Sequence, residues 1–459
     1  MPVPISPERV LPTLNADGTR NRIRPRLYDG RLLRARRWVA WALIALFVGL
    51  PLLRIGGKPA ILLDVVKREF VLFGRTFLAT DGVLLMLLML SIFVTVVLTT
   101  ALVGRAWCGW ACPQTVYMEF LFRPLERLFE GPREAQLRLD KTGANARRIA
   151  KNVVYLLLAF GLANVFLSYF VGTDALRRWV LEAPSQHLGG FSVVMVTTAL
   201  VFFDFAYFRE QMCTVICPYA RLQSVLLDPK SLLVGYDARR GEPRSKGKAT
   251  QPGHGDCIDC QACVVACPTG IDIRQGLQLE CIACGQCADA CDSIMDRIHK
   301  PQGLIRYASQ AALETGKPSP MLRPRVAVYA LALLGLVVTL LLLGGKPAAP
   351  EITLLRGLGA PFSEAGAEVV NQLRLKVRNR TSERRSFSVT VVGMPSARVV
   401  APELPLVVAP GEQGVANFFV VAPRSALQGS QRVQLRVGNE QASELVPYTL
   451  LGPEAGTKP

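Results

Sequence analysis

Five stretches of the chain are apolar over enough residues to cross a membrane. They run from Trp38 to Gly57, Gly82 to Val103, Ala150 to Val171, Gly190 to Phe208 and Val326 to Leu343. A membrane-spanning helix needs about 20 predominantly apolar residues, so each stretch predicts one span. Five crossings would place the two ends of the chain on opposite sides of the membrane.

After the last apolar stretch the pattern changes from continuous to alternating. In "NQLRLKVRN" the apolar Leu373, Leu375 and Val377 alternate with basic residues, and "SFSVTVV", "VANFFVV" and "VQLRVGN" follow, separated by Gly, Pro and Ser. A period of two predicts strands with one buried face. Several short strands in succession favour an immunoglobulin-like sandwich.

Basic residues are unevenly distributed around the predicted spans. The chain has 53 Lys and Arg against 35 acids, a formal charge of +18, and arginines crowd the residues before the first stretch and the segments 105–148 and 209–325. By the positive-inside rule these regions face the cytoplasm, and the segment after the fifth span faces the other side. No zinc-finger or RNP motif accompanies the charge, so the expected partner is the lipid bilayer and not nucleic acid.

All twelve cysteines lie in those basic regions, so structural disulfides are not expected. Between Cys257 and Asp292 the pattern C-x2-C-x2-C-x3-C occurs twice. Two-cluster ferredoxins take three thiolates of each 4Fe-4S cluster from one run and the fourth from the other. The predicted sets are Cys257, Cys260, Cys263 and Cys291 for one cluster, and Cys281, Cys284, Cys287 and Cys267 for the second. Zinc also accepts four thiolates, but it does not require this spacing twice.

A second cysteine pattern, C-x3-C-P, joins Cys108 to Cys112 and Cys213 to Cys217, each pair at the cytoplasmic end of a predicted span. Residues four apart share one helical face, and the proline after each pair predicts a break there. We therefore expect the four sulfurs to converge. Soft thiolates suit copper(I), zinc or iron-sulfur clusters. Copper binding, a further cluster, disulfide cycling and simple packing as small apolar residues all remain open at this point.

Three other side chains are weaker candidates. Asp204 is an ionisable residue inside the fourth predicted span, which raises a functional question, although nearby Arg209 favours a paired or solvated carboxylate. Glu119 is interpreted as an ordinary helix residue, and Met118 as a packing residue.

These patterns predict a mixed fold: an α-helical membrane domain with five spans, an inserted two-cluster ferredoxin-like domain and a C-terminal all-β immunoglobulin-like sandwich. The expected boundaries are a basic cytoplasmic arm (1–37), a four-span membrane domain with both C-x3-C-P motifs (38–254), the ferredoxin-like domain (255–300), a cytoplasmic linker (301–325), the fifth span (326–343) and the sandwich (344–459).

The segments "WCGWACPQTVYMEF", "EQMCTVICPYARLQSVLLD", "YDARRGEPR" and "GLIRY", together with the ferredoxin run, resemble the cytochrome c oxidase accessory protein family, also called CcoG, FixG or RdxA. The resemblance implies a multi-pass protein of the bacterial inner membrane, with its N-terminus and clusters in the cytoplasm and its C-terminal domain in the periplasm. It further implies that the protein supports maturation of the cbb-type cytochrome c oxidase by reducing Cu(II) to Cu(I).

On this resemblance the eight ferredoxin cysteines bind two 4Fe-4S clusters, and Cys108, Cys112, Cys213 and Cys217 form the catalytic thiol site, with copper as substrate. The expected partners are the oxidase or its copper-delivery factors and an unidentified electron donor. Two other functions compete with the cupric reductase. One is a quinol-linked electron relay, because membrane ferredoxin subunits of periplasmic nitrate reductase systems share the C-x3-C-P spans. The other is an assembly scaffold that docks the oxidase through its sandwich domain.

Overall fold

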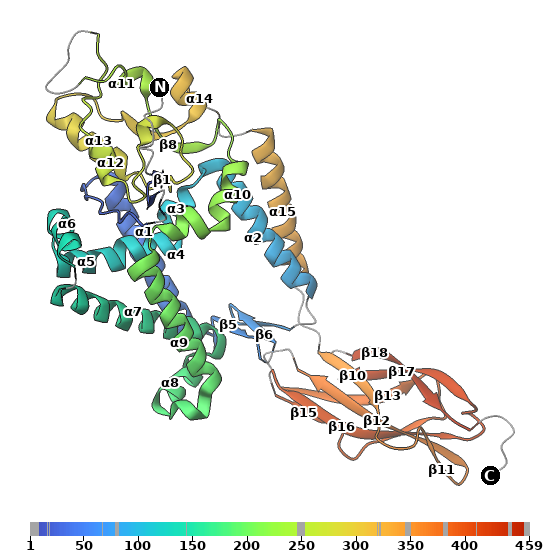
Figure 1. Cartoon of the computed structure of the whole chain (residues 1–459). Coiled ribbons are helices and arrows are strands. Elements are labelled where there is room, and N and C mark those ends of the chain that lie inside the picture. Colours follow the sequence, from blue (N-terminus) through green and yellow to red (C-terminus); the bar gives the residue numbers. More distant parts are fainter. Residues whose placement is uncertain are drawn as a thin grey trace. The chain divides into compact units, whose positions relative to one another are not determined.

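The computed structural model describes residues 9–15, 17, 19–66, 68–78, 82–143, 145–245, 253–318, 320, 323–344, 350–379, 384–409, 411–438 and 443–453. The chain divides into two compact units, Met1–Leu340 and Leu341–Pro459 (Figure 1).

Within the described residues, the first unit and the start of the second contain five helices long and apolar enough to cross a membrane, namely Arg31–Leu52, Gly82–Val103, Ala146–Val171, Pro184–Phe208 and Pro324–Gly344. They are built from α1 (Arg31–Gly49) with η1 (Leu50–Leu52), α2 (Gly82–Val103), α7 (Ala146–Val171), η4 (Pro184–His187) with α9 (Leu188–Phe203) and η5 (Asp204–Phe208), and α15 (Pro324–Gly344). Large apolar side chains such as Leu157, Leu200 and Leu331 are exposed on them, as expected of surfaces that face lipid.

The first helix differs from its predicted bounds at both ends. It begins at Arg31 instead of Trp38, and Arg36, assigned by sequence to the basic arm, is fully buried in it. The helical segment ends at Leu52, because Gly56 and Gly57 adopt positive φ and turn the chain back into a hairpin. The strands that follow were not predicted; they are β3 (Arg54–Ile55), β4 (Lys58–Pro59), β5 (Ile61–Asp64), β6 (Glu69–Leu72) and β7 (Arg75–Leu78).

Short helices connect the long ones at the end where the cysteines lie. After α2 come α3 (Ala106–Trp110), α4 (Pro113–Tyr117), η3 (Met118–Phe122), α5 (Arg123–Glu130) and α6 (Arg133–Thr142). After η5 come η6 (Met212–Ile216) and α10 (Pro218–Leu226). The remaining elements of this part are β1 (Arg9–Leu11), β2 (Leu14–Asn15) and α8 (Thr173–Leu181).

The ferredoxin-like region is closed by an antiparallel ribbon of β8 (Leu232–Tyr236) and β9 (Ile305–Ser309). Between them lie α11 (Ala238–Gly241), α12 (Ala262–Ala266), η7 (Ile273–Gln275) and α13 (Gln286–Arg297), and α14 (Gln310–Thr315) follows β9. Val234, Leu304 and Ile305 of this ribbon pack against the cysteines. The region is therefore wider than the predicted 255–300, because the ribbon supplies apolar side chains that the cysteine runs lack.

The second unit contains the predicted immunoglobulin-like sandwich. One sheet has the order β10 (Glu351–Arg356), β12 (Glu368–Arg378), β16 (Gln413–Pro423), β14 (Arg398–Val400), with β11 (Ser363–Ala365) also on β12. The other has the order β15 (Leu406–Val408), β13 (Arg385–Val392), β17 (Ser430–Gly438), β18 (Ser443–Leu451). Leu373, Leu375 and Val377 are fully buried in its core, which confirms the alternation seen in the sequence.

Candidate iron-sulfur and thiol site

The two ferredoxin runs adopt the same backbone conformation. In the first run Asp259 and Gln261 have φ of 51° and 60°, and in the second Ala283 and Gly285 have φ of 51° and 76°. These residues flank the second cysteine of each run. Positive φ is uncommon for residues other than glycine, so its repetition at matching positions shows one loop built twice. Each loop then leads into a helix, α12 or α13.

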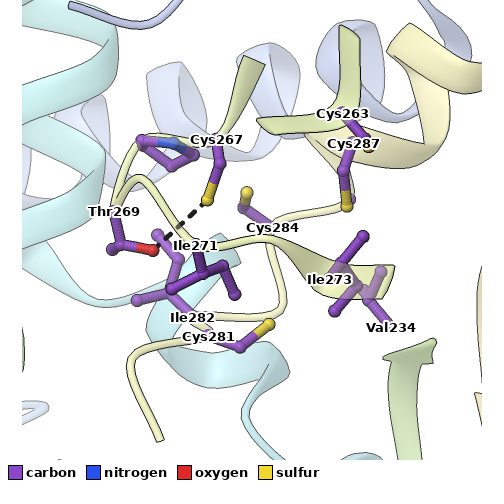
Figure 2. A pocket seen from close by; sticks show the side chains of 12 residues that line it. Val234, Cys263, Cys267, Thr269, Ile271, Ile273, Cys281, Ile282, Cys284 and Cys287 are labelled. Carbon is purple, nitrogen blue, oxygen red and sulfur yellow. Dashed lines mark hydrogen bonds between the residues drawn. The ribbon is translucent and has the colours of Figure 1, made fainter. Parts of the chain in front are cut away.

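The cysteines predicted for the second cluster surround one cavity. Figure 2 shows Cys267, Cys281, Cys284 and Cys287 lining it together with Cys263 and apolar residues including Ile271, Ile273 and Val234. The Sγ of Cys267 lies 3.4 Å from Oγ1 of Thr269. Three of these cysteines come from the loop before α13 and its first turn, whereas Cys267 follows α12, so the structure brings together thiols from both runs.

The cysteines predicted for the first cluster also gather from both runs. Cys257, Cys263 and Cys291 are buried, whereas Cys260 is exposed. Cys291 lies close enough to the other three for their charges to raise its pKa. Arg274 lies beside this set and forms ion pairs with Asp259 and with Asp272 (2.7 Å). Burial raises the pKa of Cys263, and the charge of Arg274 offsets part of that rise.

Burial raises the pKa of Cys284 to about 11 and the pKa of Cys263, Cys281 and Cys291 to about 12. These thiols therefore hold their protons at neutral pH unless a bound cation compensates the negative charge, as metals do for thiolates. Among the described residues, no three His, Cys, Asp or Glu side chains could hold a single metal ion. Two sets of four thiols, one of which lines a largely apolar cavity, fit 4Fe-4S clusters, whose ligands bind a group larger than one ion.

The membrane-edge thiol site is defined here as Cys108, Cys112, Cys213 and Cys217. Cys108 lies in α3 and Cys213 in η6, whereas Cys112 and Cys217 are extended, with ψ of 127° and 109°, directly before Pro113 and Pro218. The predicted break is present because a residue before proline is forced out of the helical region. The expected single helical face for each pair is therefore wrong, since the second cysteine of each pair lies outside the helix.

The four thiols of this site nevertheless converge. Cys108 and Cys213 belong to one apolar cluster with Tyr219, Ile282 and Cys284. Burial, and after it the charges of Cys112 and Cys217, raise the pKa of Cys108 to about 12. After burial, the charges of the other three thiols also raise the pKa of Cys213.

The membrane-edge thiol site touches the loop of the second ferredoxin set. A Cβ on Gly109 would lie 2.5 Å from the Ile282 carbonyl oxygen and 2.8 Å from the Cys284 Cα, so this contact requires glycine. Four side chains fix the position of these two loops. Arg36 Nε donates to the Gly109 carbonyl (2.9 Å), Arg105 donates to the carbonyls of Leu279 and Ala220, and Trp110 Nε1 donates to Tyr307 Oη (2.9 Å), which donates to the Ala283 carbonyl.

A buried charge network beside the thiols was not predicted. Glu126, only 2% exposed, accepts hydrogen bonds from Arg209 (2.8 and 2.9 Å) and Arg24 (2.6 Å), and Glu130 pairs with Lys151 (2.7 Å). Burial alone would raise the pKa of Glu126, but Arg209 and Arg24 more than offset it and hold the pKa well below its usual range. The only signal in the sequence was the presence of two glutamates four residues apart in a basic segment.

Glu119 and Asp204 also differ from their sequence interpretation. Glu119 is buried, forms an ion pair with Arg123 and lines a small cavity with Met118 and Cys213. Asp204 accepts a hydrogen bond from Gln114 Nε2 (3.1 Å) instead of pairing with Arg209, whose guanidinium is directed at Glu126.

Comparison with known proteins agrees with this architecture. Residues 208–310 match a family described as a 4Fe-4S dicluster domain, and residues 85–132 match a 4Fe-4S binding domain. Residues 348–453 match the IG-like fold at the C-terminal of FixG. The chain is 35% identical over 437 residues to Protein RdxA of Cereibacter sphaeroides. The aligned region covers 89% of this chain and 90% of RdxA. The chain belongs to the FixG family.

Other relatives extend the comparison. Nitrogen fixation protein FixG of Rhizobium meliloti is 34% identical over 434 residues, covering 82% of this chain and 80% of FixG. A crystal structure of a FixG-related protein from Vibrio parahaemolyticus matches 22% of this chain and 94% of that chain, with 21% identity and a TM-score of 0.21. Membership of the FixG family, with its 4Fe-4S domains and apolar helices, makes the chain an iron-sulfur protein of membrane electron transfer.

Proposed function

We propose that the protein reduces Cu(II) to Cu(I) at or beside the membrane-edge thiol site, and that the Cu(I) serves the maturation of a cbb-type cytochrome c oxidase. Its ferredoxin cysteines hold two 4Fe-4S clusters in the sets given above. The protein crosses a bacterial inner membrane five times, with its N-terminus and cysteines in the cytoplasm and its sandwich in the periplasm. The arginines around α1 and along segments 105–148 and 209–325 support this orientation.

The contact between Gly109 and the Cys284 loop carries this proposal. Bound iron-sulfur clusters supply one-electron chemistry, which matches the single electron that separates Cu(II) from Cu(I). The chain places Cys284, a ligand of the second set, and Cys108 of the thiol site in one apolar cluster. Ile282 and Tyr219 belong to the same cluster and make the surroundings of these two cysteines apolar. Soft thiolates favour Cu(I) over Cu(II), so the site also suits the product.

One observation favours a quinol-linked relay as a second candidate. Asp204 and its partner Gln114 form a polar pair next to apolar, lipid-exposed residues such as Phe203 and Tyr207. Quinol oxidation needs an acceptor for protons near an acceptor for electrons. Asp204 lies close enough to Cys213 for its charge to contribute to the raised pKa of that thiol. In this alternative the same contact would carry electrons from the membrane toward the ferredoxin region, and copper would not react.

The test uses the full-length protein in detergent under anaerobic conditions. The protein is reduced with dithionite, freed of excess reductant and mixed with Cu(II), and cluster absorbance is followed together with a Cu(I)-specific chelator. We expect Cu(I) to appear as the absorbance of the oxidised protein returns. If the reduced protein does not react with Cu(II) but is reoxidised by a soluble quinone, the result would contradict the proposal and support the relay.

A matched pair of variants locates the reaction. Cys108→Ser combined with Cys213→Ser should abolish Cu(I) formation and leave the ferredoxin absorbance in place. Thr214→Val, in the same turn as Cys213 and nearly the same shape, should react like the natural protein. Full copper reduction by the double cysteine variant would remove the thiol site from the reaction.

A further inference from the structure

We propose that the membrane-edge thiol site holds a third iron-sulfur cluster of the 4Fe-4S type, bound by Cys108, Cys112, Cys213 and Cys217. This inference goes beyond the proposed function, because it holds whether or not Cu(II) is the substrate. If it is correct, copper is reduced beside these thiols and is not bound by them.

The first observation is that the thiol site repeats a turn of the ferredoxin region. Cys263, Cys267 and Pro268 also form a C-x3-C-P sequence. There the five-residue helix α12 is followed by Cys267 in extended conformation, with φ −71° and ψ 123°. At the membrane edge, α3 is followed by Cys112 with φ −62° and ψ 127°, and η6 by Cys217 with φ −61° and ψ 109°.

The three C-x3-C-P turns are alike in backbone conformation as well as in sequence. Each of the three turns has a helical segment of five residues that carries the first cysteine, then an extended second cysteine and a proline. The turns differ in that Ala111 separates α3 from Cys112 and that η6 is a π-helix. A residue before proline favours this extended conformation, so the sequence alone produces the turn. The membrane edge therefore presents two copies of a turn that, in the ferredoxin region, supplies one cysteine to each of the two expected clusters.

The second observation concerns the spacing of the thiols. Each of the four is close enough to another for their charges to interact. Within the described residues, however, no three of them approach as ligands of one metal ion must. The same holds for the described cysteines of the two ferredoxin sets, of which no three could hold a single metal ion. Four thiols grouped in this way are compatible with a group of several metal ions.

The third observation is an amide without a partner. Gln223 is fully buried, and its Oε1 accepts from the Cys108 thiol at 3.2 Å. In the described part of the chain its Nε2 has no hydrogen-bond partner, and such a group costs free energy when buried. A thiolate is an acceptor only, so rotation of the amide would direct the N–H of Gln223 at the sulfur of a ligating Cys108. The amide is thus suited to a metal-bound thiolate.

The comparison with family models adds a fourth observation. The match described as a 4Fe-4S binding domain covers residues 85–132, a segment whose only cysteines are Cys108 and Cys112. Two thiols cannot complete a set of four. Cys213 lies in the same apolar cluster as Cys108 and its charge interacts with that of Cys217, so the second C-x3-C-P pair supplies the rest. Loading of the site takes two ferrous ions, two ferric ions and four sulfides, forms four bonds between Sγ and iron, and releases the four thiol protons.

The decisive experiment counts iron and acid-labile sulfide in the anaerobically purified full-length protein. Three 4Fe-4S clusters give about twelve iron and about twelve sulfide per chain, whereas two give about eight of each. We expect about twelve in the natural protein, about eight in Cys108→Ser with Cys213→Ser, and about twelve in Thr214→Val. A natural protein with about eight iron per chain would overturn the proposal, as would a double variant that keeps all twelve.

Spectroscopy and a milder variant cover the case in which the double variant does not fold. Cys217→Ser changes a single partly exposed ligand and should alter one of three electron paramagnetic resonance signals of the reduced protein while two remain. If the reduced natural protein shows signals of two clusters only, the proposal fails. Copper is absent from these measurements. An iron count near twelve without copper reduction would therefore refute the proposed function alone, and copper reduction with an iron count near eight would refute the third cluster alone.

Discussion

The two units of the chain bury different kinds of side chain. The cysteine-bearing unit buries arginines and glutamates, of which Arg36 and Glu130 are fully inaccessible, in addition to its thiols. Among the described residues of the sandwich, the buried polar side chains are Asn371 and Asn379, and both bond to backbone groups at 2.9 Å. Its core is otherwise apolar. The first unit thus combines apolar clusters with specific buried pairs, whereas the second relies on the area of apolar surface removed from water.

This difference follows from what each unit has to position. A buried ion pair adds little net stability over an apolar pair but is costly to break on one side. In the first unit, pairs such as Arg209 with Glu126 fix the chain between α9 and η6, next to Cys213. An apolar core could stabilise the same helices without fixing them in one register. The sandwich has no such site to hold, so packing is sufficient.

The largest effect is expected from Glu126→Gln. Removing this charge leaves Arg209 and Arg24 buried without their common partner, which should lower the free energy of unfolding by about 4 kcal/mol and lower the iron content. The measurement is the urea midpoint of the cluster absorbance. Glu134→Gln, on the exposed surface of α6, should leave it unchanged.

The same variant makes a prediction for pH. Because the pKa of Glu126 is depressed in the folded protein, its stabilisation is present above the unfolded pKa of about 4.3. It is lost as pH falls from there through the folded pKa. The natural protein should therefore lose stability over this acidic range more steeply than Glu126→Gln. Parallel curves for the two proteins would show that the ion pairs do not stabilise the first unit.

A somewhat smaller effect, confined to the other unit, is expected from Leu435→Ala. This leucine is fully buried in β17, so the lost packing and the cavity should cost about 3 kcal/mol. Hydrogen exchange of sandwich peptides in the full-length protein should accelerate, while iron content and copper reduction stay unchanged. Leu445→Ala, 48% exposed on the neighbouring strand, is the control. Loss of iron in Leu435→Ala would mean that the apolar core of the sandwich also determines the iron content of the first unit.

The features that the sequence predicted are local, and those that it missed depend on contacts between distant parts of the chain. The grouping of the ferredoxin cysteines and the alternation of Leu373, Leu375 and Val377 follow from spacing within short segments, so they were visible from sequence alone. The pairing of β8 with β9 was missed because the whole ferredoxin run separates the two strands. The sequence assigns Arg36 to the basic cytoplasmic arm, because positive charge before a span usually faces the cytoplasm. In the structure, however, its guanidinium donates a hydrogen bond to the Gly109 carbonyl. Contacts of this kind depend on tertiary structure.

A third effect should come from Gly109→Ala, at the contact between the thiol site and the Cys284 loop. The new methyl group would meet backbone atoms that cannot rotate away, so the loops must separate at a cost of about 2 kcal/mol. We expect slower Cu(I) formation with little loss of iron, measured by stopped-flow mixing. Gly161→Ala, where an added Cβ meets nothing within 4 Å, should not slow it. An unchanged rate in Gly109→Ala would argue against this contact as the route.

The smallest effect is expected at an ion pair of the same two residue types that lies on the surface instead of in the interior. Arg398 Nη2 contacts both carboxylate oxygens of Glu368, at 3.1 and 2.8 Å, on the surface of the sandwich, and the arginine side chain is 65% exposed. Water screens such a pair, so Arg398→Ala should change the free energy of unfolding by about 0.5 kcal/mol or less. A double-mutant cycle with Glu368→Gln measures the coupling between the two side chains. If this coupling equals that of Arg209 with Glu126, then burial is not what separates the two units. A value several-fold smaller would assign the difference to burial, because the chemistry of the two pairs is the same.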